Sequence, residues 1–335
     1  MSNNESSLDT HAHESDIDPC IAVIDGHYDI PLHIAAIFII MAISFLGTLL
    51  PIVFKHFATS KTGRSTITAL KLFGAGVILA TALVHMFVPA TQVLTNECLP
   101  LAFHQYEAFS AVFAIIGIFL THIVQVFAGH AIKNHQKKAL FSLDKAAIDS
   151  AGQISMPLSN ETHHEGHTHG GALMRLSEKQ LMVYLLELGI ASHSIIIGVT
   201  LGIVTDEFKT LLIALCFHQF FEGLALSAIV VEADFKKWTM SAPMVLFYTL
   251  TTPIGITIGI LVREFYNANG TSTLLSTGIL DAVSAGILAY DALVNVIYPH
   301  FSAESFNNES PMMKATQLCT MYAGCAAMSV IGLWA

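Results

Sequence analysis

The sequence predicts an all-α polytopic membrane protein with eight transmembrane helices. Hydrophobic residues make up 53% of its 335 residues and charged residues only 12%, against roughly 25% charged in an ordinary soluble domain. Eight apolar segments each approach the roughly 20 residues that a membrane-spanning helix needs. The five cysteines contain no CxxC pair, which excludes a zinc ribbon or a thiol redox motif.

Polar stretches divide the chain into four parts. Residues 1–30 form an acidic tail with seven acids and no Lys or Arg, the wrong charge for the start of a signal peptide. Residues 31–128 hold spans one to three, 129–180 form a polar His-rich loop, and 181–335 hold spans four to eight. We expect the spans at 31–54, 67–87, 109–126, 181–203, 211–231, 242–262, 274–297 and 315–334.

The distribution of basic residues predicts the orientation. If the N-terminus is extracellular, the first, third, fifth and seventh connections are cytoplasmic and, with Lys71 near the start of span two counted with the first connection, hold 13 of the 15 Lys and Arg residues. Cytoplasmic loops carry the excess of Lys and Arg. We therefore expect both termini outside and the His-rich loop in the cytoplasm.

Spans four and five carry the polar residues that a bilayer least tolerates. His218 and Glu222 are four residues apart, so they share one face of a helix, while His193 and Ser194 lie in the middle of the preceding span. Consecutive spans pack antiparallel, which brings mid-span residues to a similar depth. Imidazole and carboxylate groups suit zinc. We expect His193, His218 and Glu222 to bind a metal, with Ser194 and Gln219 as weak ligands or hydrogen-bonding neighbours.

Other ionisable residues lie inside the spans, and we interpret them in two ways. They either hydrogen-bond between helices or form a transport path of oxygen and imidazole ligands for the metal. The candidates for this path are His85, His122, Asp281 and Asp291. In the sixth span, Thr251 and Thr252 precede Pro253, which predicts a kink whose freed carbonyls the hydroxyls satisfy.

The long loop contains four histidines within seven residues. They are His163, His164, His167 and His169, in the run HHEGHTH. A flexible imidazole cluster can hold zinc transiently; the alternative is a polar linker that is merely rich in histidine. On the predicted outer side, Cys20 and Cys98 are able to pair, and Asn4 and Asn269 are candidate glycosylation sites.

At these residues the sequence resembles the ZIP (Zrt/Irt-like) family of divalent metal transporters, in particular its fungal and plant plasma-membrane branch. The resemblance rests on six motifs in order, one in each of spans one, two, four, five, six and seven: GTLLP (47–51), GAGVILATALVHM (74–86), HSIIIG (193–198), HQFFEG (218–223), TTPIGI (251–256) and SAGILAY (284–290). The His-rich loop is also typical of the family.

The resemblance implies a ZIP-type helix bundle with inverted repeats that forms a homodimer in the plasma membrane. It implies uptake of zinc (or of Fe²⁺ or Mn²⁺) into the cytosol as the transported substrate, through His193, His218 and Glu222, with Ser194 and Gln219 nearby. Relatives with two adjacent metals carry a Glu where this chain has Ile197, so we expect one transported metal. Where relatives end span seven in Val-Asp or Val-Glu, this chain has Val294 and Asn295, with an unusual acid at Asp291.

Two other functions remain as alternatives. A membrane-embedded zinc enzyme needs an activated water and an acid/base partner beside the metal, and the chain contains no HExxH motif. In a metal-sensing receptor, metal binding by the histidine loop would be the main function and transport would be residual. We expect a transporter, not an enzyme, with divalent metal and lipid but no nucleic acid as partners.

Overall fold

A computed structural model describes residue 20 and residues 28–55, 61–151, 166–205, 208–232 and 238–334. Within these ranges all regular structure is helical, which confirms the all-α class. In chain order the helices are α1 (Ile30–Lys55), α2 (Lys61–Ala80), η1 (Thr81–Phe87), α3 (Val88–Leu94), α4 (Leu101–Gln105), α5 (Phe109–Ala151), α6 (Gly166–Ile203), α7 (Phe208–Glu232), α8 (Trp238–Val262), α9 (Thr271–Tyr290), η2 (Asp291–Ile297), α10 (Tyr298–Phe301), α11 (Glu304–Asn307) and α12 (Pro311–Ile331).

Seven stretches of helix in the described ranges are long and apolar enough to cross a membrane. They are Ile30–Phe54, Ser65–Leu94, Phe109–Ala131, Gln180–Ile203, Phe208–Val231, Ala242–Val262 and Thr271–Phe301. They match the first seven predicted spans. Large apolar side chains such as Phe38, Phe119 and Leu261 remain exposed along them, as a lipid-facing surface requires. The predicted eighth span is also a helix, α12, but its Lys314, Gln317 and two Thr residues make it more polar, so the count of eight stays a prediction.

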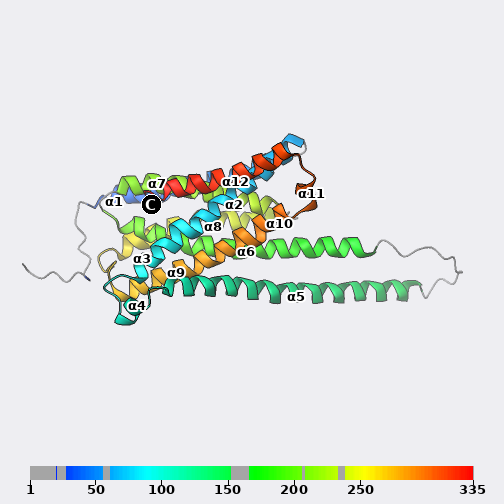
Figure 1. The fold of residues 1–335 in the computed structure, drawn as a ribbon, viewed down its shortest axis with the longest axis horizontal. Helices are drawn as coiled ribbons and strands as arrows, with labels where there is room; N and C mark the ends of the chain where they lie inside the picture. The colour runs from blue at the N-terminus through cyan, green and yellow to red at the C-terminus, as the bar shows by residue number, and fades with distance from the viewer. Residues whose placement is uncertain are drawn as a thin grey trace, which may run out of the picture.

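The third and fourth spans continue as helices well beyond their apolar segments. We expected a polar loop over residues 129–180, but α5 runs on to Ala151 and α6 begins at Gly166. The extension of α5 is rich in Ala and Lys, which favour helix even without apolar burial. In Figure 1 these two helices project beyond the rest of the bundle at one end.

The opposite end of the bundle is tied by a disulfide, and we call it the disulfide end. Cys20 and Cys98 form this bond, so the pairing that the sequence allowed is present in the structure. The start of α1, the α3–α4 connection and the C-terminus all lie at this end (Figure 1). The Thr271 hydroxyl donates to the Cys98 carbonyl, which joins the start of α9 to the same end.

The long helices form two groups, each held by close backbone contacts at glycine. In the central group, α1 packs on α7 and α6 on α8. A Cβ at Gly47 would lie closer than 3.0 Å to the Phe220 carbonyl, and one at Gly255 would lie equally close to the Ile195 carbonyl. The reciprocal contacts join Gly198 to Thr252 and, more loosely, Gly223 to Ser44.

The flanking group repeats this arrangement with different helices: α2 packs on α12, and α5 packs on α9. A Cβ at Gly76 would collide with the Met321 carbonyl, and one at Gly286 would collide with the Ala114 carbonyl. The reciprocal contacts join Gly324 to Phe73 and Gly117 to Val283. Small residues at such interfaces let membrane helices approach closely.

These matched contacts reveal an internal repeat. Residues 74–89 (GAGVILATALVHMFVP) align with 284–299 (SAGILAYDALVNVIYP), and six of the sixteen positions are identical. In both copies the α-helix becomes a π-helix just before a proline, η1 before Pro89 and η2 before Pro299. Proline cannot donate the regular backbone bond, and π-helical turns accommodate such a defect. Helices α1, α2–α3 and α5 therefore correspond to α8, α9–α10 and α12.

The two groups meet where α6 faces α9 and α7 faces α2, and here the repeat is broken. The Ser192 and Ser284 hydroxyl oxygens are 3.0 Å apart, while a Cβ at Gly74 would touch Ala225. Gly47 contacts Phe220 as Gly255 contacts Ile195, so Phe220 of α7 corresponds to Ile195 of α6, and Ala225, five residues on, corresponds to Thr200. The counterpart of the Gly74–Ala225 contact would therefore be Ser284–Thr200, whereas Ser284 contacts Ser192. Positions 192 and 200 differ by eight residues, about 12 Å along a helix at ~1.5 Å per residue.

Candidate metal site

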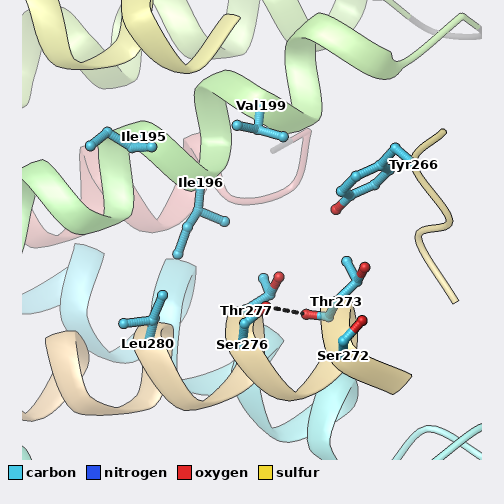
Figure 2. A pocket seen from close by; sticks show the side chains of 9 residues that line it. All are labelled: Ile195, Ile196, Val199, Tyr266, Ser272, Thr273, Ser276, Thr277 and Leu280. Atoms are coloured by element: carbon cyan, nitrogen blue, oxygen red, sulfur yellow. Dashed lines mark hydrogen bonds between the residues drawn. The ribbon is translucent and has the colours of Figure 1, made fainter. Parts of the chain in front are cut away.

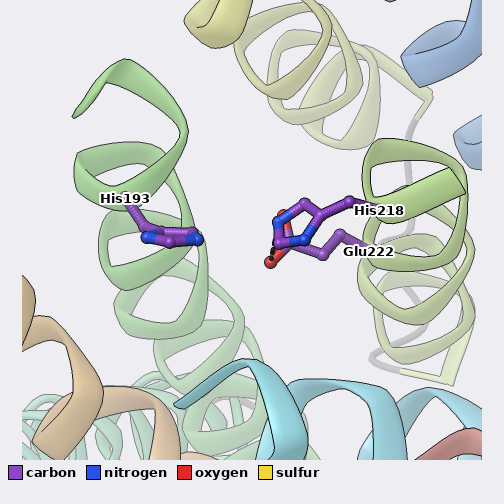
Figure 3. Close-up of side chains that lie close together, drawn as sticks. All are labelled: His193, His218 and Glu222. Carbon is purple, nitrogen blue, oxygen red and sulfur yellow. Dashed lines mark ion pairs between the residues drawn. The ribbon is translucent and has the colours of Figure 1, made fainter. Parts of the chain in front are cut away.

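The centre of the bundle brings together three predicted ligands, His193 from α6 and His218 and Glu222 from α7. We call them the central site. Their exposed fractions are 1%, 0% and 1%, and one ligand atom from each lies within 4.8 Å of the others. Figure 3 shows the His193 ring facing His218 and Glu222 across a gap between the two helices. The helix periodicity that placed His218 and Glu222 on one face is confirmed.

The distances inside this group suit a metal. His218 Nε2 lies 3.3 Å from Glu222 Oε1, and the two imidazole centroids are 5.5 Å apart. Zinc binds nitrogen and oxygen at about 2.0–2.2 Å with tetrahedral angles, which places neighbouring ligand atoms about 3.4 Å apart. Modest side-chain movement would bring all three ligands onto one ion.

The hydrogen-bond inventory points the same way. Both ring nitrogens of His193 and His218 and both carboxylate oxygens of Glu222 are buried without a hydrogen-bond partner in the described part of the chain. Leaving buried polar groups unpaired is expensive, so each such group needs an explanation. A bound cation would take one donor atom from each of the three residues and so would provide a partner for at least one buried atom of each.

The two predicted neighbours of the site behave differently from each other. The Gln219 amide donates to Thr252 Oγ1 at 2.6 Å and to Ser44 Oγ at 3.2 Å. Gln219 therefore fastens α7 to α1 and α8, which is the hydrogen-bonding role we had allowed for it. Ser194 is buried, and its hydroxyl finds no partner within the described ranges, so it is still able to act as a weak ligand.

Of the four candidate path residues, His85 and Asp281 lie beside the central site. The His85 ring is 5.2 Å from the His218 ring, while its Nε2 lies 2.7 Å from the Met328 carbonyl oxygen. Asp281 Oδ1 lies 3.5 Å from Nδ1 of His193. Each flanks the site from a helix of the flanking group.

The other two candidates make contacts of their own away from the three ligands. His122 Nδ1 lies 2.9 Å from the Tyr290 hydroxyl, and the imidazole is exposed. Asp291 is buried in η2 and accepts a hydrogen bond from Asn295, one turn further along. The hydrogen-bonding interpretation therefore accounts for His122 and for one oxygen of Asp291.

The histidines of the long loop lie largely outside the described residues. His163 and His164 fall in the undescribed segment, and His167 and His169 fall in the first turn of α6, where side chains are not described. Their binding of metal stays a prediction.

Sequence reasoning missed the residues that position α7. Tyr248 of α8 is buried, and its hydroxyl donates to the Gln219 carbonyl at 2.6 Å, while Ser44 contacts the Gln219 amide. Ser192, which links α6 to α9, was also overlooked. The internal repeat was a usable signal, because it places Ser44 and Thr252 at matching positions three residues before Gly47 and Gly255.

Fold and site together define a polytopic helical membrane protein with a buried group of ligands suited to a divalent metal. The family model described as "ZIP Zinc transporter" matches residues 30–332. The chain therefore belongs to the ZIP zinc transporter family.

Individual relatives come from fungi and plants. Zinc-regulated transporter 1 of Candida albicans is 35% identical over 310 residues, which cover 92% of this chain and 62% of the relative. Zinc transporter 5 of Oryza sativa is 34% identical over 316 residues, covering 91% and 87%. Fe(2+) transport protein 2 of Arabidopsis thaliana is 30% identical over 328 residues, covering 95% and 90%. The chain thus spans less than two thirds of the Candida relative and about nine tenths of the two plant relatives.

Proposed function

We propose that this protein carries zinc across a membrane into the cytosol, and that the ion pauses on His193, His218 and Glu222. The observation that carries the proposal is that the buried nitrogen and oxygen atoms of these three side chains have no hydrogen-bond partner in the described part of the chain. Fe²⁺ is a second candidate substrate, since one relative is named for Fe(2+) transport, and Mn²⁺ is a third. Both have the same charge and accept the same donor types.

The central site is suited to transient binding. Three protein ligands leave at least one position for water, whereas a closed four-ligand site would hold a structural ion. Conduction requires binding strong enough to admit the ion and weak enough to release it. Both histidines must be neutral to bind the metal, so acid is expected to reduce uptake.

Movement of the central group against the flanking group would expose the site to each side in turn. Within each group, the helix contacts made by one repeat are matched by those of the other. At the boundary between the groups, the contact observed on α6 lies about 12 Å along the helix from the contact that the repeat predicts. If α6 and α9 adopted the arrangement that α7 and α2 have now, α6 would shift along α9 by that distance and Thr200 would lie opposite Ser284. Rigid-body movement of this kind is typical of transporters built from inverted repeats.

The remaining topology is proposed on the same basis. We place α12 as the eighth span, the disulfide end and both termini outside the cell, and the projecting ends of α5 and α6 in the cytoplasm. The excess of basic residues on the loop side supports this orientation, and so does a disulfide on the side that we place outside. A plasma-membrane location and a homodimer rest on the resemblance to the family.

The family assignment favours transport over the enzyme and receptor alternatives. Glu222, the residue best placed to act as a base, is itself one of the three ligands. We therefore propose that the protein is not an enzyme.

Uptake of radioactive zinc by cells that express the protein tests the proposal. We expect His218→Ala to abolish saturable uptake at matched surface expression, because loss of a group that only supports a metal ligand already costs about 10–100-fold in metal affinity and this variant removes one of three ligands. His104→Ala is the matched control, since this histidine is exposed in α4, is not one of the three ligands, and contacts only the nearby Leu99 carbonyl among the hydrogen bonds described. Unchanged uptake in His218→Ala would overturn the site.

A further inference from the structure

A pocket opens between α6 and α9 near the disulfide end. Its cavity volume is about 430 Å³. Figure 2 shows α6 on one side, the first three turns of α9 on the other, and the Tyr266 ring at one margin. The lining residues are Ile195, Ile196, Val199, Tyr266, Ser272, Thr273, Ser276, Thr277 and Leu280.

The lining suits a cation that still carries its water. The α9 side presents four hydroxyl residues and Tyr266 adds a phenol, while the α6 side is aliphatic and no lining residue is an acid or a base. Six waters of a hydrated divalent ion occupy roughly 180 Å³ at ~30 Å³ each, so the pocket has room for the whole hydrate. Hydroxyl groups hydrogen-bond such waters without removing them.

The carboxylate of Asp281 and the imidazole of His193 lie just beyond the inner end of the pocket. Ile196 and Leu280 approach each other at its inner end (Figure 2). Asp281 is the next residue after Leu280, and His193 lies one turn before Ile196 on α6. A path through the pocket therefore reaches Asp281 and His193 before it reaches α7.

The positions of Asp281 and His193 suit a cation bound between them. Asp281 Oδ1 and His193 Nδ1 are 3.5 Å apart, close to the separation of about 3.4 Å expected for two ligands of one tetrahedral zinc. Both atoms are buried and neither has a hydrogen-bond partner within the described ranges. A residue that merely oriented His193 would make that hydrogen bond, and here it is not made.

We propose that Asp281 and the Nδ1 atom of His193 form a capture site for the divalent cation. The hydroxyl-lined pocket is its vestibule, and the ion passes from this capture site to His218 and Glu222. Asp281 supplies the only carboxyl group on this route before Glu222 among the residues described. The proposal rests on the transport function proposed above and adds to it the place where the hydrated ion first loses water.

Protection from labelling tests the vestibule directly. In a background with Cys216, Cys319 and Cys325 replaced by Ser, we introduce Ser276→Cys and treat intact cells with a membrane-impermeant thiol reagent. We expect labelling from outside and at least a fivefold slower rate with Zn²⁺ present. Adding Asp281→Asn should remove the protection but leave the labelling. Glu107→Cys, exposed between α4 and α5, is the control whose labelling zinc should not slow.

Two results of this experiment would overturn the proposal. A Ser276→Cys variant that resists labelling from outside would show that the pocket does not open to that side. Protection by zinc that persists with Asp281→Asn would show that Asp281 does not hold the ion.

Uptake kinetics separate a capture ligand from a residue that only supports the fold. We expect Asp281→Asn to raise the KM for zinc at least tenfold at matched surface expression, and Asp281→Glu to restore most of the affinity by returning the carboxylate. An unchanged KM in Asp281→Asn, or no recovery in Asp281→Glu, would contradict the proposal. If His218→Ala abolishes uptake while Asp281→Asn leaves KM unchanged, only the capture site is wrong. If His218→Ala itself transports normally, the proposed function is at fault.

Discussion

Glu222 is the only acid among the three residues that meet at the centre of the bundle. Its carboxylate has an exposed fraction of 1%, and neither of its oxygens has a hydrogen-bond partner among the described residues. A divalent cation would provide the opposite charge that makes burial of this carboxylate favourable.

The charge on Glu222 therefore matters more than its shape. We expect Glu222→Gln to lower the kcat/KM of zinc uptake by about 100-fold, the upper end of the range found when a group that supports a metal ligand is lost, because an amide is a neutral and weaker donor. Uptake of radioactive zinc, normalised to surface protein, measures this. Glu304→Gln changes an exposed acid in α11 and should transport like the wild type. Normal uptake by Glu222→Gln would mean that this carboxylate does not bind the ion.

At the scale of helices, the packing of α6 on α8 is set by glycine. A Cβ at Gly255 would lie closer than 3.0 Å to the Ile195 carbonyl oxygen, a backbone atom of α6. Backbone cannot rotate away as a side chain does, so the two helices would have to separate.

We expect Gly255→Ala to destabilise the protein by about 1–3 kcal/mol, the usual cost of overpacking a close interface. A lower melting temperature of the purified protein in detergent would report it. Gly270→Ala lies before α9, where an added Cβ meets its nearest atom at 3.1 Å, and it should melt close to the wild type. Equal melting temperatures for both variants would contradict this account of the α6–α8 contact.

His167 and His169 of the histidine cluster lie in the first turn of α6, at the end that projects beyond the bundle (Figure 1). Because transport is proposed to occur within the bundle, replacing His163, His164, His167 and His169 by Asn should leave the initial rate of zinc uptake within about twofold, while changing metal binding by the loop. Initial-rate measurements at low zinc test this. Complete loss of uptake would instead make the loop part of the transport path, or support the sensor alternative.

For the whole molecule, the internal repeat predicts a second arrangement of the two helix groups. Ser192 and Ser284 are in contact now, and the exchanged arrangement would place Thr200 opposite Ser284, about 12 Å of travel along α6. With the three free cysteines replaced, we expect both Ser192→Cys/Ser284→Cys and Thr200→Cys/Ser284→Cys to cross-link, and each cross-link to stop uptake.

The cross-linking experiment has a clear negative outcome. Mass spectrometry of the oxidised protein would identify each bond. If only the first pair cross-links under conditions where zinc is being transported, the groups do not slide by this distance. The pair Thr200→Cys/Leu261→Cys provides a control, since Leu261 is exposed on the outside of α8.

Much of this protein follows from its sequence alone. Hydropathy placed seven spans because a bilayer admits only helices whose backbone is satisfied internally, and the spacing of His218 and Glu222 placed both on one face because helix periodicity is local. Hydropathy does not detect a helix that continues without apolar residues, so the sequence predicts a loop where α5 and α6 extend beyond their apolar segments. Hydropathy is also a weaker signal for α12, which is helical but comparatively polar.

Only the tertiary structure decided which distant residues meet. Asp281 beside His193, His85 beside His218, Tyr248 on Gln219 and Cys20 bonded to Cys98 join positions that are far apart in the chain. Such contacts depend on how helices rotate and slide when glycine lets their backbones touch, and periodicity within one helix carries no information about its rotation against another. The eight-residue offset between the two groups is also decided by the tertiary structure. The repeat in the sequence predicts equivalent contacts for its two copies, but the two groups pack against each other in a way that is not equivalent.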